Sequence, residues 1–222
     1  MAIVKKHDFV EIEYTGKLKE DGAVFDTTRE NAAREKGIYD KNADYSPAII
    51  CIGENNILKA LDEQLVGKET GKEYTLEIDS ENAFGRKDAK LIQMIPLSKF
   101  RQQRINPVPG LQLNIDGVFG IVKTVSGGRC LVDFNHPLAG KDLVYDVSIN
   151  RIIDGTQDKL KSLLKIHLQI KDAEIELKDE TASIKSGHKI PKEALEEFRK
   201  IAERSVPSVK NIEFDASPDK NK

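Results

Sequence analysis

The spacing of apolar residues predicts several strands along the first half of the chain. Apolar and polar side chains alternate over residues 8–16 and again over 74–79, which is the period of a half-buried strand. A hairpin turn pair, Asp21-Gly22, precedes a short apolar strand at 23–25, and residues 47–53 form a candidate buried strand. A last strand is expected where four apolar residues share one face: Leu143, Tyr145, Val147 and Ile149.

One helix is predicted after the segment 47–53. Asn55 or Asn56 can cap its N-terminus, and Gly67 can end it. Its apolar stripe consists of Ile57, Leu58, Leu61 and Leu65. Residues 27–45 show little periodicity, so we expect a long surface excursion there, with one helical turn around 30–35.

The pattern changes between Arg86 and Cys130. An apolar run at 91–97 precedes a short helix predicted at 99–104, which Ser98 can cap. Two or three short strands follow, at 111–115, 118–125 and 129–134, with turns at Asp116-Gly117 and 126–128 between them. A β-domain of about 45 residues is marginal alone, but insertion into a host domain fixes both of its ends. We therefore predict an inserted, β-rich domain at 86–131.

Another change of pattern follows the boundary pair Asp154-Gly155. Four leucines between 160 and 168 predict a helix, and two short segments, 173–177 and 181–185, predict a hairpin. Pro191 stands at the start of a second amphipathic helix, and residues 209–214 form a last strand. The sequence thus predicts an α+β module at 156–215 and a disordered polar tail at 216–222.

Composition narrows the class of protein. The chain has 222 residues, of which 39% are hydrophobic and 32% charged, with a net charge of −2. No apolar run approaches the roughly 18 residues of a membrane span, and residues 1–8 lack the apolar segment of a signal peptide. The balanced charge gives no overall electrostatic attraction to nucleic acid. Two cysteines, Cys51 and Cys130, cannot form a disulfide framework. We expect a cytoplasmic protein that binds neither membrane nor nucleic acid.

The sequence contains no catalytic motif of the common kinds. The sequence has no phosphate loop, dinucleotide fingerprint or nucleophile elbow. Its four histidines are scattered, with no His or Cys pair at the spacing of metal ligands. We therefore expect no metal and no cofactor, and an enzyme of this sequence would use neither a metal nor a covalent nucleophile.

Six separated motifs, taken together, are more specific. They are Val10–Gly16, Asp21–Thr28, Ile52–Leu61, Asn82–Gly85, Asn135–Gly140 and Leu143–Val147. In this order and spacing they resemble the FKBP family of peptidyl-prolyl cis-trans isomerases. The inserted segment resembles the insert-in-flap (IF) domain of SlyD-like members, and with the C-terminal module the chain resembles a long-chain archaeal FKBP. The resemblance covers residues 6–153.

This resemblance implies an α+β fold in which a half-barrel of antiparallel strands wraps a helix. The isomerase domain would comprise residues 1–85 and 132–153, interrupted by the inserted domain. The family's proline pocket maps onto eight residues: Tyr14, Phe25, Asp26, Ile57, Leu58, Leu61, Phe84 and Tyr145. Leu61 would form the floor, and a free backbone N–H at the helix entry would bind a substrate carbonyl. The resemblance implies catalysis by apolar enclosure of the X-Pro bond.

The SlyD-like insert implies chaperone activity as well. Its expected partners are unfolded or partly folded polypeptides that contain proline. Leu138 and Ala139 would belong to the shortened flap, and the apolar residues expected to hold clients in the insert are Leu91, Ile92, Met94, Ile95 and Phe100. Each of these could instead serve the small core of the insert. The C-terminal module carries no chemical motif, and we expect it to form a homodimer.

Other interpretations stay open at this point. The pocket aromatics could be ordinary core residues, and His136 is expected to order a turn beside Pro137 rather than bind a ligand. Leu61 and Ala48 stand where many family members have aromatic residues, which puts tight macrolide binding in doubt. The alternative function is therefore a client-holding chaperone with a weak or vestigial isomerase pocket. A third is an adaptor whose C-terminal module recruits the isomerase to an assembly.

Overall fold

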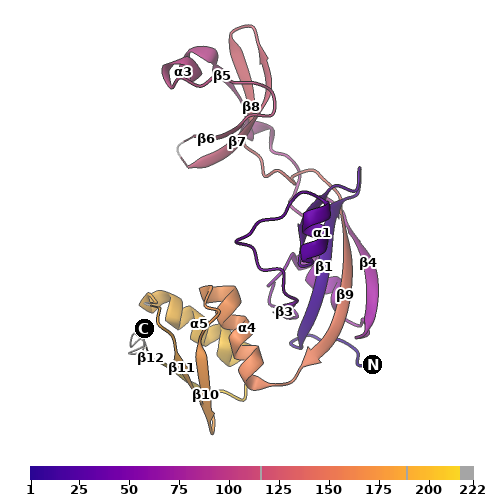
Figure 1. Ribbon diagram of the computed structural model, residues 1–222, viewed down its shortest axis with the longest axis vertical. Coiled ribbons are helices and arrows are strands. Elements are labelled where there is room, and N and C mark those ends of the chain that lie inside the picture. Colours follow the sequence, from indigo (N-terminus) through magenta and orange to yellow (C-terminus); the bar gives the residue numbers. More distant parts are fainter. Residues whose placement is uncertain (116, 189, 216–222) are drawn as a thin grey trace. The chain divides into compact units, whose positions relative to one another are not determined.

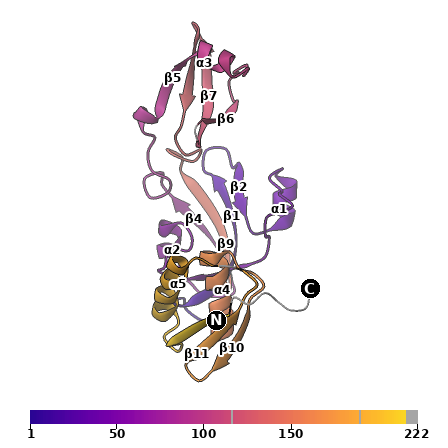
Figure 2. The ribbon, with the colours of Figure 1, turned by 90° about the vertical axis from the view of Figure 1, so that its left-hand side faces the viewer.

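The computed structural model describes residues 1–115, 117–188 and 190–215. They fall into two compact units, one built from Met1–Glu77 together with the chain from Val144 onward, and the other from Ile78–Leu143. The strands and helices of both units make an α+β protein, as the sequence predicts (Figures 1 and 2). None of the described helices is long and apolar enough to cross a membrane.

The first unit is built around a five-stranded sheet. Its path runs β2-β1-β9-β4, and β3 also pairs with β1. The strands are β1 (Phe9–Leu18), β2 (Val24–Thr27), β3 (Ala48–Cys51), β4 (Lys72–Ile78) and β9 (Leu143–Ile153). The alternation predicted from the sequence is confirmed where Ile12, Val147 and Ile149 are buried between more exposed neighbours, whereas Phe9 beside Val10 is buried as well.

Two short helices accompany this sheet. α1 (Glu30–Glu35) is the helical turn expected in the excursion, and α2 (Lys59–Leu65) is the helix expected after β3. The predicted cap of α2 is wrong, because the helix begins after Leu58 and no side chain caps it. Asn55 adopts a left-handed conformation, with φ at 53°, and Asn56 Oδ1 accepts the backbone N–H of Cys51 at 2.8 Å. Asn56 thus ties the loop back to β3 instead of starting the helix.

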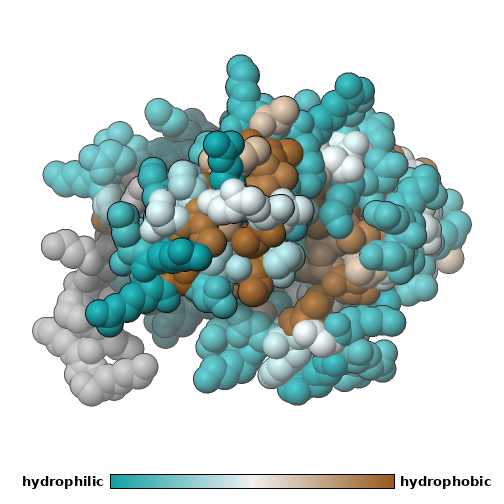
Figure 3. Space-filling model, turned by 90° about the horizontal axis from the view of Figure 1, so that it is seen from above, coloured by the Kyte–Doolittle hydropathy of each residue, from teal (hydrophilic) through white to brown (hydrophobic). Residues whose placement is uncertain are grey.

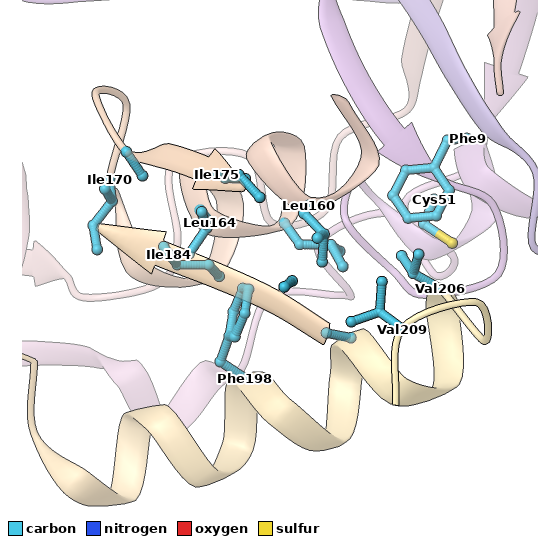
Figure 4. Packing of buried hydrophobic residues seen from close by; sticks show 14 of the residues in the cluster. Phe9, Cys51, Leu160, Leu164, Ile170, Ile175, Ile184, Phe198, Val206 and Val209 are labelled. Carbon is cyan, nitrogen blue, oxygen red and sulfur yellow. The ribbon is translucent and has the colours of Figure 1, made fainter. Parts of the chain in front are cut away.

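The C-terminal part of the first unit packs two helices against a three-stranded sheet. The elements are α4 (Thr156–Leu168), β10 (Glu174–Lys178), β11 (Thr181–Lys185), α5 (Lys192–Ser205) and β12 (Asn211–Asp215). β11 is central, antiparallel to β10 and parallel to β12. Their buried core also includes Phe9 of β1 and Cys51 of β3, which lie beside Val206 and Val209 (Figure 4). The predicted tail at 216–222 lies outside the described residues.

The second unit contains a four-stranded sheet in the order β5-β8-β7-β6. Its elements are the 3-10 turn η1 (Ala89–Leu91), β5 (Ile92–Pro96), α3 (Leu97–Gln102), β6 (Gln112–Ile115), β7 (Val118–Ser126) and β8 (Arg129–Asp133). Three strands therefore follow the helix. The small core consists of Phe100, Leu113, Val122, Cys130 and Val132. Asp116, predicted as a turn residue, lies outside the described residues.

The predicted start of α3 is wrong by two residues. The helix begins at Leu97 directly after Pro96, so Ser98 is not its cap. Pro96 still pairs with Arg129 across the sheet, and the Leu97 N–H bonds to the Gly128 carbonyl at 2.9 Å. Because proline fixes its own φ near the helical value and lacks an N–H, the strand can pass straight into a helix there.

Candidate functional site

Four of the predicted site residues contact one another in the first unit. Tyr14 lies on β1, Phe25 and Asp26 on β2, and Tyr145 on β9, and these strands are neighbours in the sheet. The Tyr14 hydroxyl donates to Asp26 Oδ2 at 2.9 Å. The ring of Tyr145 lies 5.9 Å from that of Tyr14 and 5.8 Å from that of Phe25, the latter edge-to-face at 86°. The pairing of three strands thus builds an aromatic cluster with one carboxylate.

The cluster depends on the absence of a side chain at Gly16. A Cβ there would lie 2.8 Å from Phe25 Cζ and 2.9 Å from Tyr145 Cε1, closer than real Cβ contacts. Gly16 pairs with Asp26 across the hairpin, and its φ is not in the left-handed region. The glycine is therefore needed for space and not for an unusual backbone conformation.

Two threonines that the sequence analysis did not single out hold Tyr14 in place. Thr28 Oγ1 accepts the backbone N–H of Tyr14 at 2.8 Å, and Thr27 Oγ1 donates to the Tyr14 carbonyl at 2.9 Å. Both threonines are buried. The signal that could have found them is their position directly after Asp26, where a buried hydroxyl needs a partner.

Both tyrosine hydroxyls stay protonated near neutral pH. Burial, and then the negative charge of Asp26, raise the pKa of Tyr14, and the same two causes raise the pKa of Tyr145 to about 12. Neutral phenols can donate hydrogen bonds but cannot act as bases at pH 7. The cluster therefore offers shape, aromatic surface and hydrogen bonds rather than proton transfer.

The predicted floor of the pocket lies at the start of α2. Leu61 is 1% exposed, whereas Ile57 and Leu58 are half-buried. The carbonyl of Leu58 accepts the first helical N–H groups, from Leu61 and Asp62. Among the described residues the backbone N–H of Ile57 has no acceptor. It is thus available to a substrate carbonyl.

Asp62, which the sequence analysis also missed, fixes the loop before α2. Its carboxylate is almost fully buried and accepts the backbone N–H groups of Gly53, at 2.9 Å, and Asn55, at 3.1 Å. Burial raises the pKa of Asp62 despite these hydrogen bonds. The signal in the sequence was its place four residues after Leu58 and three before Leu65, on the apolar stripe of the helix, where a charge needs local partners.

Phe84 belongs to the second unit, where it stacks on His136. The two rings are 4.3 Å apart and nearly parallel, at 4°, and Phe84 is 37% exposed. His136 Nδ1 accepts the N–H of Leu138, and its carbonyl accepts the N–H of Ala139, so His136 orders this turn as the sequence analysis expects. Leu138 is half-buried and Ala139 is buried.

The residues predicted to hold clients differ in their exposure. Met94 is 59% and Leu91 40% exposed, Ile92 and Ile95 are half-buried, and Phe100 is in the core of the unit. A surface pocket beside them is lined by Met94, Ile95, Pro96, Phe100, Ile115 and Phe134. Val118 and Phe119 of β7 add further exposed apolar surface that the sequence analysis did not name. Brown apolar patches interrupt the hydrophilic, teal surface in the space-filling view (Figure 3).

Among the described residues no three His, Cys, Asp or Glu side chains are grouped so that they could hold a metal ion. Both cysteines are buried and unpaired. Burial raises the pKa of the Cys51 thiol to about 11, so it carries no thiolate near neutral pH.

Comparisons with known proteins identify the family. The model of the FKBP-type peptidyl-prolyl cis-trans isomerase matches residues 2–100, and that of the FKBP26 IF domain matches residues 93–138. A short-type peptidyl-prolyl cis-trans isomerase of Methanocaldococcus jannaschii is 32% identical over 150 residues, 68% of this chain and 94% of that protein. The chain belongs to the FKBP family. It is therefore an isomerase, as its motifs predict, and the matched IF domain makes it a SlyD-like FKBP.

Two bacterial relatives extend the similarity. A probable FKBP-type 16 kDa isomerase of Pseudomonas fluorescens is 36% identical over 115 residues, covering 50% of this FKBP and 75% of that protein. The isomerase SlyD of Vibrio cholerae is 28% identical over 128 residues, covering 55% and 63%.

Proposed function

We propose that this FKBP isomerises X-Pro bonds at a site in the first unit made by Tyr14, Phe25, Asp26, Ile57, Leu58, Leu61 and Tyr145. The family resemblance adds Phe84 of the second unit to this set. The observation that carries the assignment is the aromatic cluster of three strands, in which Tyr14 is hydrogen-bonded to Asp26 and Tyr145 packs edge-to-face on Phe25. The names of the relatives favour an active isomerase over a client-holding protein with a vestigial pocket.

The chemistry of the reaction suits these residue types. The planar X-Pro amide is stabilised by resonance that places charge on its oxygen, and the barrier to rotation is about 20 kcal/mol. The twisted transition state loses this charge separation. Apolar and aromatic walls therefore destabilise the planar state relative to the twisted one. A 10⁴-fold acceleration would need about 5.5 kcal/mol of such differential stabilisation.

Hydrogen bonds would orient the substrate in this site. The N–H of Ile57, which no described residue accepts, would bind a substrate carbonyl, while the aromatic rings hold the proline ring. The raised pKa of Tyr145, about 12, keeps its hydroxyl a donor throughout the neutral range. No proton needs to move during the reaction.

The second unit would hold unfolded or partly folded polypeptides that contain proline. The exposed side chains of Leu91 and Met94 favour this role, and we assign Ile92, Ile95, Leu138 and Ala139 to the same surface, with Phe100 beneath it. On this division residues 1–85 and 132–153 form the isomerase domain, 86–131 the inserted chaperone domain, and 156–215 the C-terminal domain.

We propose a cytoplasmic homodimer, joined through the C-terminal domain, with neither membrane nor nucleic acid as a partner. The net charge of −2 favours protein clients over nucleic acid. Light scattering at micromolar protein tests the dimer, and a mass near 24.8 kDa would contradict it.

Two assays separate the two proposed sites. One follows isomerisation of a short X-Pro peptide, and the other the refolding of a protein whose folding is limited by proline. Asp26→Ala with Tyr145→Phe is expected to abolish the peptide activity. Leu91→Ser with Met94→Ser is expected to preserve peptide activity and to slow protein refolding. Leu177→Ser, at an exposed leucine of β10 outside the insert, is the matched control and should change neither. Equal activity of the wild type and the pocket variant on the peptide would contradict the assignment.

A further inference from the structure

The C-terminal part of the first unit contacts the loop that leads into α2 through an ion pair. Glu54, in that loop, receives Arg204 Nε on Oε1 at 3.0 Å and Arg204 Nη2 on Oε2. Arg204 lies in the last turn of α5. The side chain of Glu54 is only 7% exposed, whereas that of Arg204 is 60% exposed. The carboxylate is therefore a nearly buried charge whose main partner comes from α5.

The loop that carries Glu54 is held at nearly every residue. Asp62 accepts the N–H groups of Gly53 and Asn55, and Asn56 bonds back to Cys51. Ile57, whose N–H has no acceptor in the part of the chain that the structure describes, comes directly after these residues. Glu54 lies within this loop, three residues before Ile57. A change that moves the loop backbone at Glu54 would therefore also move the Ile57 N–H.

The position of Arg204 is itself fixed by the shared apolar core. Val206 and Val209, which follow α5, pack in one cluster with Phe9 and Cys51, the last residue of β3 (Figure 4). All four side chains are buried. The end of α5 thereby packs against β3, the strand from which the loop starts. This packing holds Arg204 beside Glu54.

We propose that Arg204 is a positioning residue for the isomerase reaction, acting through Glu54 on the Ile57 N–H. The proposal rests on the assignment of that N–H to the substrate carbonyl. On this proposal a residue of the C-terminal domain contributes to substrate binding in the isomerase domain. His7 Nδ1, 3.8 Å from Glu54 Oε1, is too distant to replace the two hydrogen bonds of Arg204.

The balance of charge makes the role testable. Removing Arg204 leaves the Glu54 carboxylate nearly buried without its ionic partner, and such a charge must move toward water. If the charge of Glu54 is removed at the same time, no unpaired buried charge is left, and the side chain no longer has to move toward water. A neutral glutamine has almost the same shape, so the loop should return to its original position in the double variant.

The variants are Arg204→Met, which keeps much of the alkyl stem, Glu54→Gln, and the two combined. Arg151→Met is the matched control. Arg151 also binds a glutamate, Glu11, through Nη2 at 2.9 Å, and its side chain is 64% exposed, but that pair does not touch the loop. Peptide isomerisation is measured for each variant well below its own unfolding midpoint, and the amide signal of Ile57 is followed by NMR.

We expect Arg204→Met to lower kcat/KM about tenfold, chiefly by raising KM, because the lost contact binds substrate and transition state alike. The Ile57 amide signal should shift. Glu54→Gln in the Arg204→Met background should restore kcat/KM to within about twofold of the wild type, a rescue that lost stability alone would not give. Arg151→Met should change neither activity nor the amide signal.

Three outcomes would overturn the proposal. These are an unchanged kcat/KM in folded Arg204→Met, a loss that Glu54→Gln does not restore, and an equal loss in Arg151→Met. If Arg204→Met does not fold, Arg204→Lys replaces it, with a smaller loss expected and the same rescue required. An inactive wild type would refute the proposed function, whereas activity that depends on Asp26 but not on Arg204 would refute this inference alone.

Discussion

The hydroxyl of Tyr14 on β1 donates a hydrogen bond to the carboxylate of Asp26 on β2, with 2.9 Å between the two oxygens. Hydrogen bonds to an ionised acceptor are stronger than neutral ones, so this contact fixes the direction of the phenol. The ring is thereby held 5.9 Å from that of Tyr145. Asp26 thus acts on the geometry of the aromatic cluster, and an acid–base role is not needed to explain its presence.

Tyr14→Phe tests this relationship, because it keeps the ring and removes only the donor. We expect kcat/KM on a short X-Pro peptide to fall about fivefold, the effect of about 1 kcal/mol of lost orientation. The thermal midpoint should change little because the bond is exposed to solvent. Tyr74→Phe is the control, since the Tyr74 hydroxyl also takes part in a hydrogen bond, with the N–H of Glu69, outside the cluster. Equal activity of Tyr14→Phe and the wild type would contradict the role of the pair.

Gly16→Ala is expected to damage the site by crowding it. The added methyl group would lie under 3 Å from the rings of Phe25 and Tyr145, so one of them must move. Overpacking of this kind lowers the unfolding free energy by about 1–3 kcal/mol. We expect kcat/KM on the peptide to fall by a factor that corresponds to at least the same energy. Gly187→Ala is the control, because no atom of the described residues lies within 4 Å of the Cβ that it would add. Chemical denaturation and peptide kinetics measure the two effects. Wild-type kinetics in Gly16→Ala would show that the rings do not shape the substrate site.

Alkaline pH should destabilise the first unit through Tyr145. Its pKa is about 12 in the folded protein, raised by burial and by Asp26, against about 10 in an unfolded chain. A raised pKa contributes stability that is complete below pH 10 and is lost as the pH rises toward 12. At pH 11 the loss from this group is about 1 kcal/mol. Denaturant midpoints at pH 9 and pH 11 measure it, and Tyr145→Phe should reduce the difference. An equal difference in the two proteins would contradict this account.

The strands could be predicted from the sequence because their signal is local. Alternating side chains place Val10 and Ile12 on one face whatever else the chain does, and the structure buries both. Helix starts were harder, because distant hydrogen bonds decide them. Asn56 bonds back to Cys51 and Asp62 to Gly53, five and nine residues away, and the period of the apolar stripe does not by itself show which residue makes these bonds.

The candidate site residues were predicted chiefly through the family motifs. The residues that hold them in place, such as Thr27, Thr28 and Asp62, were not predicted. Tyr14 and Tyr145 are far apart in sequence and meet only because β1 and β9 are neighbours in the sheet. The same limitation applies to the C-terminal domain. Its packing on Phe9 could not be foreseen. An apolar residue at the start of a strand is expected to be buried, but the sequence does not show which helix covers it.

Acid should weaken the second unit through Asp133, at the end of β8. This buried carboxylate accepts Lys87 Nζ at 2.7 Å and two hydrogen bonds from Asn135, which in turn bonds the backbone of Asp88. Burial raises the pKa of Asp133, but the hydrogen bonds from Lys87 and Asn135 outweigh it and hold the pKa at about 2. Asp133 thus joins the two chain segments that flank the four-stranded sheet.

A lowered pKa contributes stability that is complete above about pH 4 and is lost as the pH falls toward 2. The shift from a usual value near 3.9 corresponds to about 2 kcal/mol at neutral pH. The Asp133→Asn protein should lack that stability at pH 7 and should lose less further stability on acidification. The NMR methyl signals of Val122 and Val132, in the core of the unit, measure its unfolding. Asp142→Asn is the control, because Asp142 accepts a backbone N–H from Ser80 at an exposed position. If the Asp133→Asn protein lost its methyl signals over the same acid range and to the same extent as the wild type, another carboxylate would be responsible for the acid transition.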